Sequence, residues 1–226
     1  MSDEVIPIDE PLLSWNDARA AALRRRFQRA GVFVVNLMSG PGAGKTTLLE
    51  VTLTALGGAA QVGVIVGDLA TDNDATRLSR TSGLVRQITT GTVCHLEAAM
   101  VEQALNGWAV ETLDYLFIEN VGNLVCPAAF DLGEHVRVVL FAVTEGEDKP
   151  EKYPPLVHRA DLILLTKYDL APLLGFDFDR FVQSVRRVHP HAAIIPLSAR
   201  TGMGMPTWLD WLAQARAVAS ARPAHG

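Results

Sequence analysis

The sequence predicts an α/β fold, a mostly parallel sheet with helices on both faces. Short apolar runs rich in β-branched residues, typical of buried strands, alternate with longer segments of helical periodicity. The chain has 226 residues, of which 49% are hydrophobic and 20% are charged. This length and composition suit one compact domain with a sizeable core.

The expected elements follow from these patterns. Strands are expected at residues 32–38, 62–66, 84–89, 113–118, 136–143, 162–165 and 193–197. Helices are expected at residues 14–30, 46–56, 95–108, 178–188 and 205–219. Strands that alternate with helices imply right-handed crossovers and parallel pairing. Acidic residues and prolines predict a flexible arm over 1–13, followed by a single domain over 14–220 and a frayed tail over 221–226.

Charge and hydropathy exclude several classes of protein. The net charge of −5 argues against a nucleic-acid partner, because such proteins usually carry a basic face. No apolar run reaches the roughly 18–20 residues that span a bilayer, and the acidic first residues do not resemble a secretory signal. We therefore expect a cytoplasmic protein with neither a nucleic-acid nor a membrane partner.

A glycine-rich loop follows the first expected strand and opens a helix. It has the pattern G-x-x-x-x-G-K-[ST], with Ser39 in place of the first glycine. Glycines let main-chain N–H groups surround a triphosphate at the positive end of the helix. We expect Lys45 to reach the β- and γ-phosphates, Thr46 to bind Mg²⁺ and Thr47 to reach the α-phosphate. The motif predicts a P-loop NTPase whose nucleotide contacts here are Gly40, Gly42, Ala43, Gly44, Lys45, Thr46 and Thr47.

Two further strands end near carboxylates. Asp68 closes the run 62–66, and Glu119 follows the run 113–118. Acids at the carboxyl ends of strands beside the phosphate loop lie where Mg²⁺ and the attacking water are held. We therefore predict Thr46, Asp68 and Glu119 as Mg²⁺ ligands, and Lys45, Asp68 and Glu119 as the catalytic groups. The alternative for Asp68 is capping of a helix near residues 71–74.

A switch motif and a base-recognition motif complete the nucleotide site. Glu119 begins an E-x-x-G string in which the Gly122 N–H can sense the γ-phosphate. Thr166, Lys167 and Asp169 match [NT]-K-x-D after a buried strand. An aspartate there accepts from both guanine N–H donors, which adenine lacks, so GTP is favoured over ATP. A loop after the last strand, with Ser198 and Ala199, is expected to meet guanine O6 through its main chain.

The two cysteines fall near the same end of the predicted sheet. Cys94 precedes His95, and Cys126 lies seven residues after Glu119. A disulfide is unfavourable in a reducing compartment. Thiolate and imidazole ligands suit Ni²⁺ or Zn²⁺, so Cys94, His95 and Cys126 are candidate metal ligands. The alternative is two buried core cysteines with a histidine at a helix N-terminus.

On these motifs the chain resembles the HypB family of hydrogenase maturation GTPases. The matching stretches are residues 36–49, 67–75, 94–98, 119–127 and 144–154. The resemblance implies a SIMIBI-type P-loop GTPase with slow intrinsic GTP hydrolysis and Mg²⁺ as cofactor. It implies a GTP-dependent homodimer that delivers nickel to the large subunit of [NiFe]-hydrogenase with the metallochaperone HypA. It also implies that Cys94, His95 and Cys126 form a metal site at or near the dimer interface.

The chain departs from this family in several respects, among them Val93, where glycine is common, and Glu97, where Asp is common. It has no Cys-rich N-terminal motif and no His-rich stretch, so nickel storage is not expected of it. Thr166 stands where Asn is usual, and is expected to brace the phosphate loop less well.

Two other functions are compatible with the motifs. One is a urease-type nickel accessory GTPase, although that family normally carries a Cys-Pro-His metal motif. The other is a non-catalytic scaffold that holds nucleotide and metal. GTP turnover separates an enzyme from a scaffold, and no arginine finger is assigned from the sequence.

Overall fold

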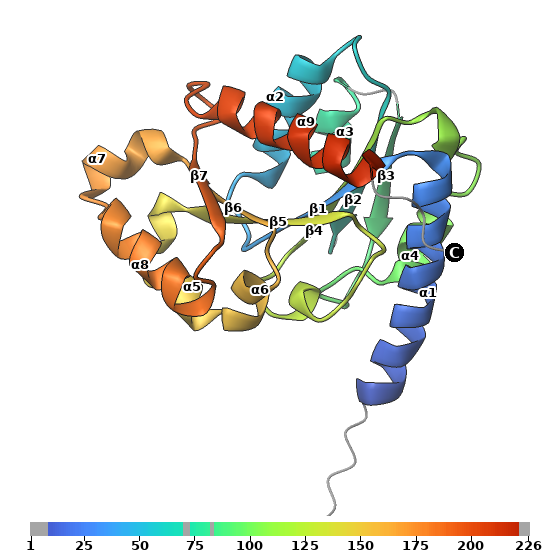
Figure 1. Ribbon diagram of the computed structural model, residues 1–226, viewed down its shortest axis with the longest axis horizontal. Helices are drawn as coiled ribbons and strands as arrows, with labels where there is room; N and C mark the ends of the chain where they lie inside the picture. The colour runs from blue at the N-terminus through green and yellow to red at the C-terminus, as the bar shows by residue number, and fades with distance from the viewer. Residues whose placement is uncertain (1–8, 70–72, 82–83, 222–226) are drawn as a thin grey trace, which may run out of the picture.

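The computed structural model describes residues 9–69, 73–81 and 84–221, and these form an α/β domain around one seven-stranded sheet (Figure 1). The strands pair in the order β3-β2-β4-β1-β5-β6-β7, and every pair is parallel. Their bounds are β1 Phe33–Ser39, β2 Val62–Asp68, β3 Leu84–Thr89, β4 Tyr115–Gly122, β5 Val136–Ala142, β6 Leu162–Thr166 and β7 Ala193–Pro196. The predicted fold class is confirmed.

The α-helices precede, connect and follow these strands. They are α1 Asp9–Ala30, α2 Lys45–Leu56, α3 Asn73–Leu78, α4 Ala98–Ala104, α5 Lys149–Lys152, α6 Pro154–His158, α7 Ala171–Leu174, α8 Phe178–Val188 and α9 Met205–Ala221. Single 3₁₀ turns are η1 Val110–Thr112, η2 Cys126–Ala128, η3 Val143–Glu145 and η4 Tyr168–Leu170. Parallel strands need such crossovers, which carry the chain back across a face of the sheet.

Alternating side chains of the buried strands give the sheet two apolar faces. On one face, strand residues such as Val35 and Phe117 pack against Leu49 of α2, Leu78 of α3 and Trp208 of α9. The other face is covered by α1 and α4 over one half of the sheet, and by α6 and α8 over the other half. Figure 1 shows the resulting three layers. Because both faces are covered, the carboxyl edge of the sheet is left for a site.

Two expected helices have different bounds in the structure. Helix α1 begins at Asp9, so the predicted arm over 1–13 is wrong for residues 9–13. Asp-Glu-Pro suits a first helical turn, where an acid meets the positive helix end and proline needs no N–H partner. The helix expected at 95–108 is only Ala98–Ala104, because Glu97 is extended and Gly107 has a φ of 79°. Residues 1–8 and most of the predicted tail, 222–226, lie outside the described residues.

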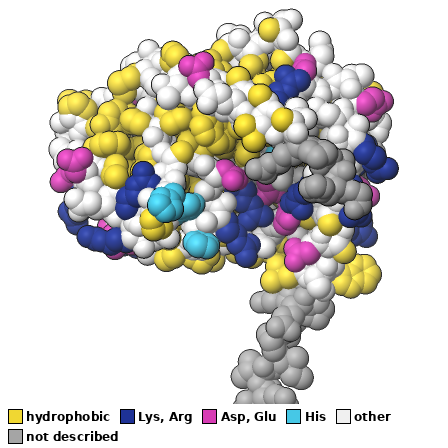
Figure 2. Space-filling view, in the orientation of Figure 1, with side chains coloured by type: hydrophobic (Ala, Val, Ile, Leu, Met, Phe, Trp, Pro, Cys, Tyr) yellow, Lys and Arg dark blue, Asp and Glu magenta, His cyan; other side chains and the backbone are white. Residues whose placement is uncertain are grey.

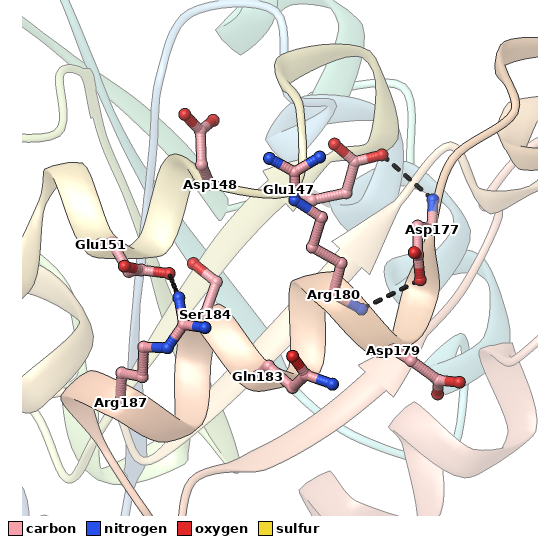
Figure 3. Close-up of a pocket in the computed structure, with 9 residues that line it drawn as sticks. All are labelled: Glu147, Asp148, Glu151, Asp177, Asp179, Arg180, Gln183, Ser184 and Arg187. Carbon is pink, nitrogen blue, oxygen red and sulfur yellow. Dashed lines mark hydrogen bonds and ion pairs between the residues drawn. The ribbon is translucent and has the colours of Figure 1, made fainter.

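A polar crevice separates α5 from α8 (Figure 3). It has a volume of about 490 Å³ and is crossed by a 2.7 Å ion pair between Glu151 and Arg187. Asp177 caps α8 by accepting from the Arg180 N–H at 3.0 Å, and its own N–H donates to Glu147 at 3.0 Å. The charged groups of the crevice therefore hold α8 against the turn that leads into α5.

The outer surface mixes charge signs. On the face drawn in Figure 2, Lys and Arg side chains are interspersed with Asp and Glu, and hydrophobic side chains gather beside edge strand β7 and along α9. Among the described residues, no helix has the length and apolar character that a membrane crossing requires.

A buried hydrogen bond joins α9 to α2 on the face of the sheet that these helices cover, and its removal tests how much it stabilises the fold. The Trp208 indole N–H donates to Thr52 Oγ1 at 2.9 Å, and the Thr52 hydroxyl donates to the Leu48 carbonyl at 2.7 Å. Thr52→Val should lower the free energy of unfolding by about 1–3 kcal/mol, because the buried indole N–H loses its acceptor. The control is Thr54→Val, whose exposed hydroxyl makes the same local bond to Glu50 at 2.8 Å. Equal losses for the two variants in urea unfolding would contradict this prediction.

Candidate nucleotide and metal sites

The phosphate loop joins β1 to α2 in the order that the sequence predicts. Gly42 and Gly44 have φ values of 75° and 97°, which glycine adopts without strain. Lys45 is buried, and its Nζ lies 2.9 Å from Ser39 Oγ. Burial lowers the pKa of Lys45, while neighbouring carboxylates, Glu119 foremost, oppose this shift. Ser39 therefore has a function that the motif alone did not indicate, since its hydroxyl holds the ammonium group inside the loop.

Thr166 braces this loop from strand β6. Its hydroxyl lies 2.6 Å from the carbonyl oxygen of Ala43 and 3.2 Å from that of Phe141. A hydroxyl donates one proton, and the shorter contact identifies Ala43 as the better acceptor. Thr166 therefore contacts the phosphate loop directly, and the expectation that it braces the loop less well than Asn stays a prediction.

Glu119 lies beneath the loop and is buried. Its Oε1 accepts from the Thr46 hydroxyl at 2.8 Å, and its buried Oε2 has no hydrogen-bond partner among the described residues. Burial raises the pKa of Glu119 to about 7, against the opposing effects of Lys45 and the Thr46 hydrogen bond. An unpartnered carboxylate oxygen beside a hydroxyl fits the oxygen ligands that Mg²⁺ prefers.

Asp68 approaches the same hollow from the neighbouring strand. It ends β2, two residues after Val66, which pairs in register with Glu119 of β4. Its Oδ1 accepts from the Leu69 N–H at 2.5 Å. A hollow of about 430 Å³ is lined by Pro41, Gly42, Gly44, Lys45, Thr46, Thr47, Gly67, Asp68, Asp74, Arg77, Glu119, Asn120, Gly122 and Lys167. The alternative of capping near 71–74 falls partly on residues 70–72, outside the described residues.

The E-x-x-G segment touches the phosphate loop directly. Strand β4 continues past Glu119 to Gly122, and its register with β1 shifts between Leu37 and Ser39. A Cβ at Gly122 would meet Pro41 Cα at 3.0 Å, so only glycine allows this approach. The loop and the expected switch are therefore in contact through backbone.

The residues predicted to recognise guanine lie on two adjoining loops. Lys167 lines the nucleotide hollow and adopts a left-handed φ of 55° after β6. Asp169 lies in the turn η4 that follows. The Tyr168 N–H donates to the Leu197 carbonyl at 3.1 Å, and this bond ties η4 to the loop of Ser198 and Ala199. Lys167 thus reaches the hollow, and the loops that carry Asp169, Ser198 and Ala199 are joined to each other next to it.

The predicted metal ligands also meet. Ligand atoms of Cys94, His95 and Cys126 all lie within 4.8 Å of one another, and the two Sγ atoms are 2.6 Å apart. The His95 ring stacks on Phe130 with centroids 3.8 Å apart. Neither buried ring nitrogen has a hydrogen-bond partner in the part of the chain described, although Nε2 is 3.4 Å from Glu97 Oε1. Unpartnered imidazole nitrogens beside two thiols fit a soft or borderline divalent metal.

The chemistry of this cluster depends on its surroundings. Burial lowers the pKa of His95, which favours the neutral ring that binds metals, while Glu97 opposes the shift. The neighbouring Cys94 thiol raises the pKa of Cys126, so a bound cation would have to stabilise the thiolate. The three side chains are half-buried, which leaves a route for exchange.

Several residues that were not predicted as site residues lie at or between the two sites. The Asn120 side chain accepts from the Leu96 N–H at 3.4 Å, next to His95. The Asn123 amide donates to the Cys94 carbonyl at 3.3 Å. Arg77 lines the nucleotide hollow from helix α3, which only the alternative interpretation of Asp68 anticipated. A basic residue shortly after the acid that ends β2 was the only sequence signal for Arg77.

Comparisons with known proteins agree with this geometry. The family model described as CobW/HypB/UreG, nucleotide-binding domain, matches residues 33–196. The hydrogenase maturation factor HypB of Azotobacter chroococcum mcd 1 is 50% identical over 214 residues, which cover 94% of this chain and 70% of the relative. That of Escherichia coli K12 is 46% identical over 208 residues, covering 92% and 72% respectively.

Solved structures show the same likeness. The crystal structure of HypB from Helicobacter pylori in complex with nickel has a TM-score of 0.85 and 36% identity, and covers 93% of this chain and 99% of that one. A LAO/AO transport system kinase shares the fold alone, with a TM-score of 0.59 and 17% identity over 96% of this chain and 80% of that one. The chain belongs to the HypB family of hydrogenase maturation factors, with a CobW/HypB/UreG nucleotide-binding domain.

Proposed function

We propose that this chain is a GTPase that hydrolyses GTP to GDP and phosphate and helps to deliver nickel to the large subunit of [NiFe]-hydrogenase. The proposal depends on one observation: Glu119, beneath the phosphate loop, and Cys126, in the metal cluster, belong to the same short segment. Its further support is the family, whose members are named hydrogenase maturation factors.

Nucleotide binding would use groups that already converge. Main-chain N–H groups of the loop and the Lys45 ammonium group would hold the phosphates, and buried Lys45 would be more effective there than in water. Thr46, Asp68 and Glu119 would hold Mg²⁺. When bound, Mg²⁺ neutralises charge on the β- and γ-phosphates. Lys45 and the main-chain donors would stabilise the charge that develops on the transferred phosphoryl oxygens.

Guanine selection would come from Asp169. Its carboxylate can accept from both N1–H and the 2-amino group, whereas adenine presents a different pattern of donors. The Lys167 stem would lie over the base. The Ser198 and Ala199 loop, tied to η4 by the bond between Tyr168 and Leu197, would meet O6 with its main-chain N–H groups.

Nickel would be the cargo of the Cys94, His95 and Cys126 cluster. The likeness to a relative crystallised with nickel supports Ni²⁺ as the ligand, and the same donors accept Zn²⁺. One chain offers three ligands, so a second copy in a GTP-dependent homodimer would complete the shell. We further propose that a HypA-type metallochaperone and the hydrogenase large subunit exchange nickel with this site.

A second function has specific support among the relatives. HypB of Helicobacter hepaticus, 40% identical over 96% of this chain and 90% of its own length, is named a hydrogenase/urease maturation factor. Nickel supply to urease would use the same cluster, so the two deliveries differ in partner rather than in chemistry. A nucleotide scaffold without turnover is the remaining alternative.

Turnover tests the proposal against the scaffold. The full chain with Mg²⁺ should release phosphate slowly from GTP, and Lys45→Ala should abolish release because the buried ammonium group is lost. The control is Lys152→Ala, whose exposed ammonium group pairs with Asp148 at 2.6 Å. No phosphate release by wild type, with or without Ni²⁺ or Zn²⁺, would refute the enzyme.

Glu119 should make stability depend on pH in the nucleotide-free, Mg²⁺-free protein. Its folded pKa of about 7 lies above its ordinary value, so between about pH 4.5 and 7 the folded state keeps a proton that the unfolded state has lost. Stability therefore falls as pH rises through this window, by about 3 kcal/mol at most. Glu119→Gln should gain stability relative to wild type between pH 5 and 8 in urea unfolding. An unchanged difference between the two proteins at both pH values would show that Glu119 does not titrate there.

Nickel affinity should depend on the nucleotide. Because Cys126 follows the E-x-x-G segment, a switch that moves with the γ-phosphate would move a metal ligand. We expect Ni²⁺ affinities with GDP and with a non-hydrolysable GTP analogue to differ about tenfold or more, or ~1.4 kcal/mol. Cys126→Ser should bind Ni²⁺ weakly with either nucleotide yet retain guanine nucleotide. Equal Ni²⁺ affinities of wild type in the two states would remove the coupling.

A further inference from the structure

A guanidinium group faces the nucleotide hollow beside the phosphate loop. Arg77 of α3 lines the hollow together with Lys45, Thr46 and Thr47. Its Nη2 lies 3.4 Å from Thr47 Oγ1. The arginine thus lies beside the loop residue that we expect to contact the α-phosphate.

The packing of α3 against α2 fixes the backbone position of Arg77. Leu78, the next residue, is fully buried in the core that contains Leu48 and Leu49 of α2, and Ala75 packs against the same core. The buried side of α3 therefore holds the short helix against α2. Arg77 consequently projects along α2 toward the loop rather than away from it.

Glu50 orients the guanidinium group. Arg77 Nε and Nη2 donate to Glu50 Oε1 and Oε2 at 3.1 and 2.6 Å, a two-point contact that fixes the plane of the fork. Thr47 and Glu50 are one helical turn apart on α2, so the fork spans the turn that begins at the loop. The hydrogen bond to Glu50 also raises the pKa of Arg77, so the group stays cationic.

A contribution to fold stability does not by itself account for the contacts of Arg77. The Arg77 side chain is 42% exposed, and exposed pairs add little to stability. Its Nη1 forms only a long ion pair with Asp74 Oδ1, at 3.6 Å, so the Nη1 N–H groups have no hydrogen-bond partner among the described residues. While Nε and Nη2 are held by Glu50, the Nη1 N–H groups can donate to phosphate oxygens, which arginine binds with defined geometry.

We propose that Arg77 binds the α-phosphate of the guanine nucleotide, with Glu50 as its positioning residue. This inference deepens the proposed function and rests on it. Because GDP and GTP both carry an α-phosphate, Arg77 strengthens the binding of both equally and leaves the hydrolysis step unchanged. An arginine that acted on the γ-phosphate would instead raise the turnover number.

Binding measurements with matched variants test this role. Calorimetry of the full chain with Mg²⁺ should show that Arg77→Gln weakens GDP and a non-hydrolysable GTP analogue by the same factor, about tenfold or more, as loss of a charged hydrogen bond predicts. The turnover number at saturating GTP should stay within about twofold of wild type. The control is Arg80→Gln, an exposed arginine three residues further on that does not line the hollow. It should bind both nucleotides as wild type does.

A double variant separates a phosphate contact from a side effect. Arg77→Gln leaves the Glu50 carboxylate without its partner, and the freed charge could itself repel phosphate. In Glu50→Gln/Arg77→Gln that charge is gone, so the loss of affinity should persist if Arg77 contacts phosphate. Should Arg77→Gln fail to fold, Arg77→Lys keeps the charge opposite Glu50 but loses the fork, and it should still weaken GDP and the GTP analogue equally.

Three results would overturn the inference while leaving the proposed function intact. They are unchanged nucleotide affinity in Arg77→Gln, recovery of affinity in the double variant, and a loss confined to the GTP analogue or to turnover. Failure of wild type to bind either nucleotide would instead refute the proposed function, and the inference with it.

Discussion

The hydrogen bond from the Thr46 hydroxyl to Glu119 joins the phosphate loop to strand β4, and the remaining candidate chemistry depends on that connection. Helix α2 and strand β4 come from distant parts of the chain and meet because β4 pairs beside β1 in the sheet. Burial leaves the second oxygen of Glu119 without a partner. A cation beneath the loop would satisfy that oxygen and keep the carboxylate ionised.

The same strand leads from the nucleotide hollow to the metal cluster. After Glu119, Asn120 accepts from the main chain next to His95, and Gly122 rests against Pro41. Asn123 then holds the Cys94 carbonyl. These contacts place both sites on one continuous segment of backbone. A shift of β4 relative to the loop would therefore move the thiols. Glycine at position 122 allows this segment to pack directly on the loop, where a side chain would collide with Pro41.

The sequence alone predicts the features that depend on patterns of neighbouring residues. The apolar strands, the phosphate loop and the bounds of β3 and α8 follow from patterns of neighbouring residues. The contact of Cys94 with Cys126 could be expected only in outline. Cys94 follows β3 and Cys126 follows β4, so the contact depends on the order β3-β2-β4, and strand order is set by how crossovers pack. Helix α3 was anticipated only in the alternative for Asp68 and not among the expected helices, because only Leu78 of its six residues is buried, which is too few for a periodic pattern.

Interactions between distant elements explain the other differences. The hydrogen bond from Thr166 to Ala43 spans 123 residues and depends on the closeness of β6 to the loop, so local sequence patterns do not predict it. Arg77 was not predicted as a site residue, and the helix that carries it was not among the expected helices. The start of α1 at Asp9 was not predicted because acids and a proline occur both in a first helical turn and in a flexible arm.

The central claim is that one hollow at the carboxyl edge of the sheet holds a guanine nucleotide with Mg²⁺. Competition between GDP and ADP for the purified full chain in the presence of Mg²⁺ tests it most directly. The arrangement of Asp169, Lys167 and the Ser198 loop predicts that GDP binds and that ADP fails to displace it even in large excess. Equal competition by ADP, or no retention of either nucleotide, would contradict the claim regardless of what the thiols bind.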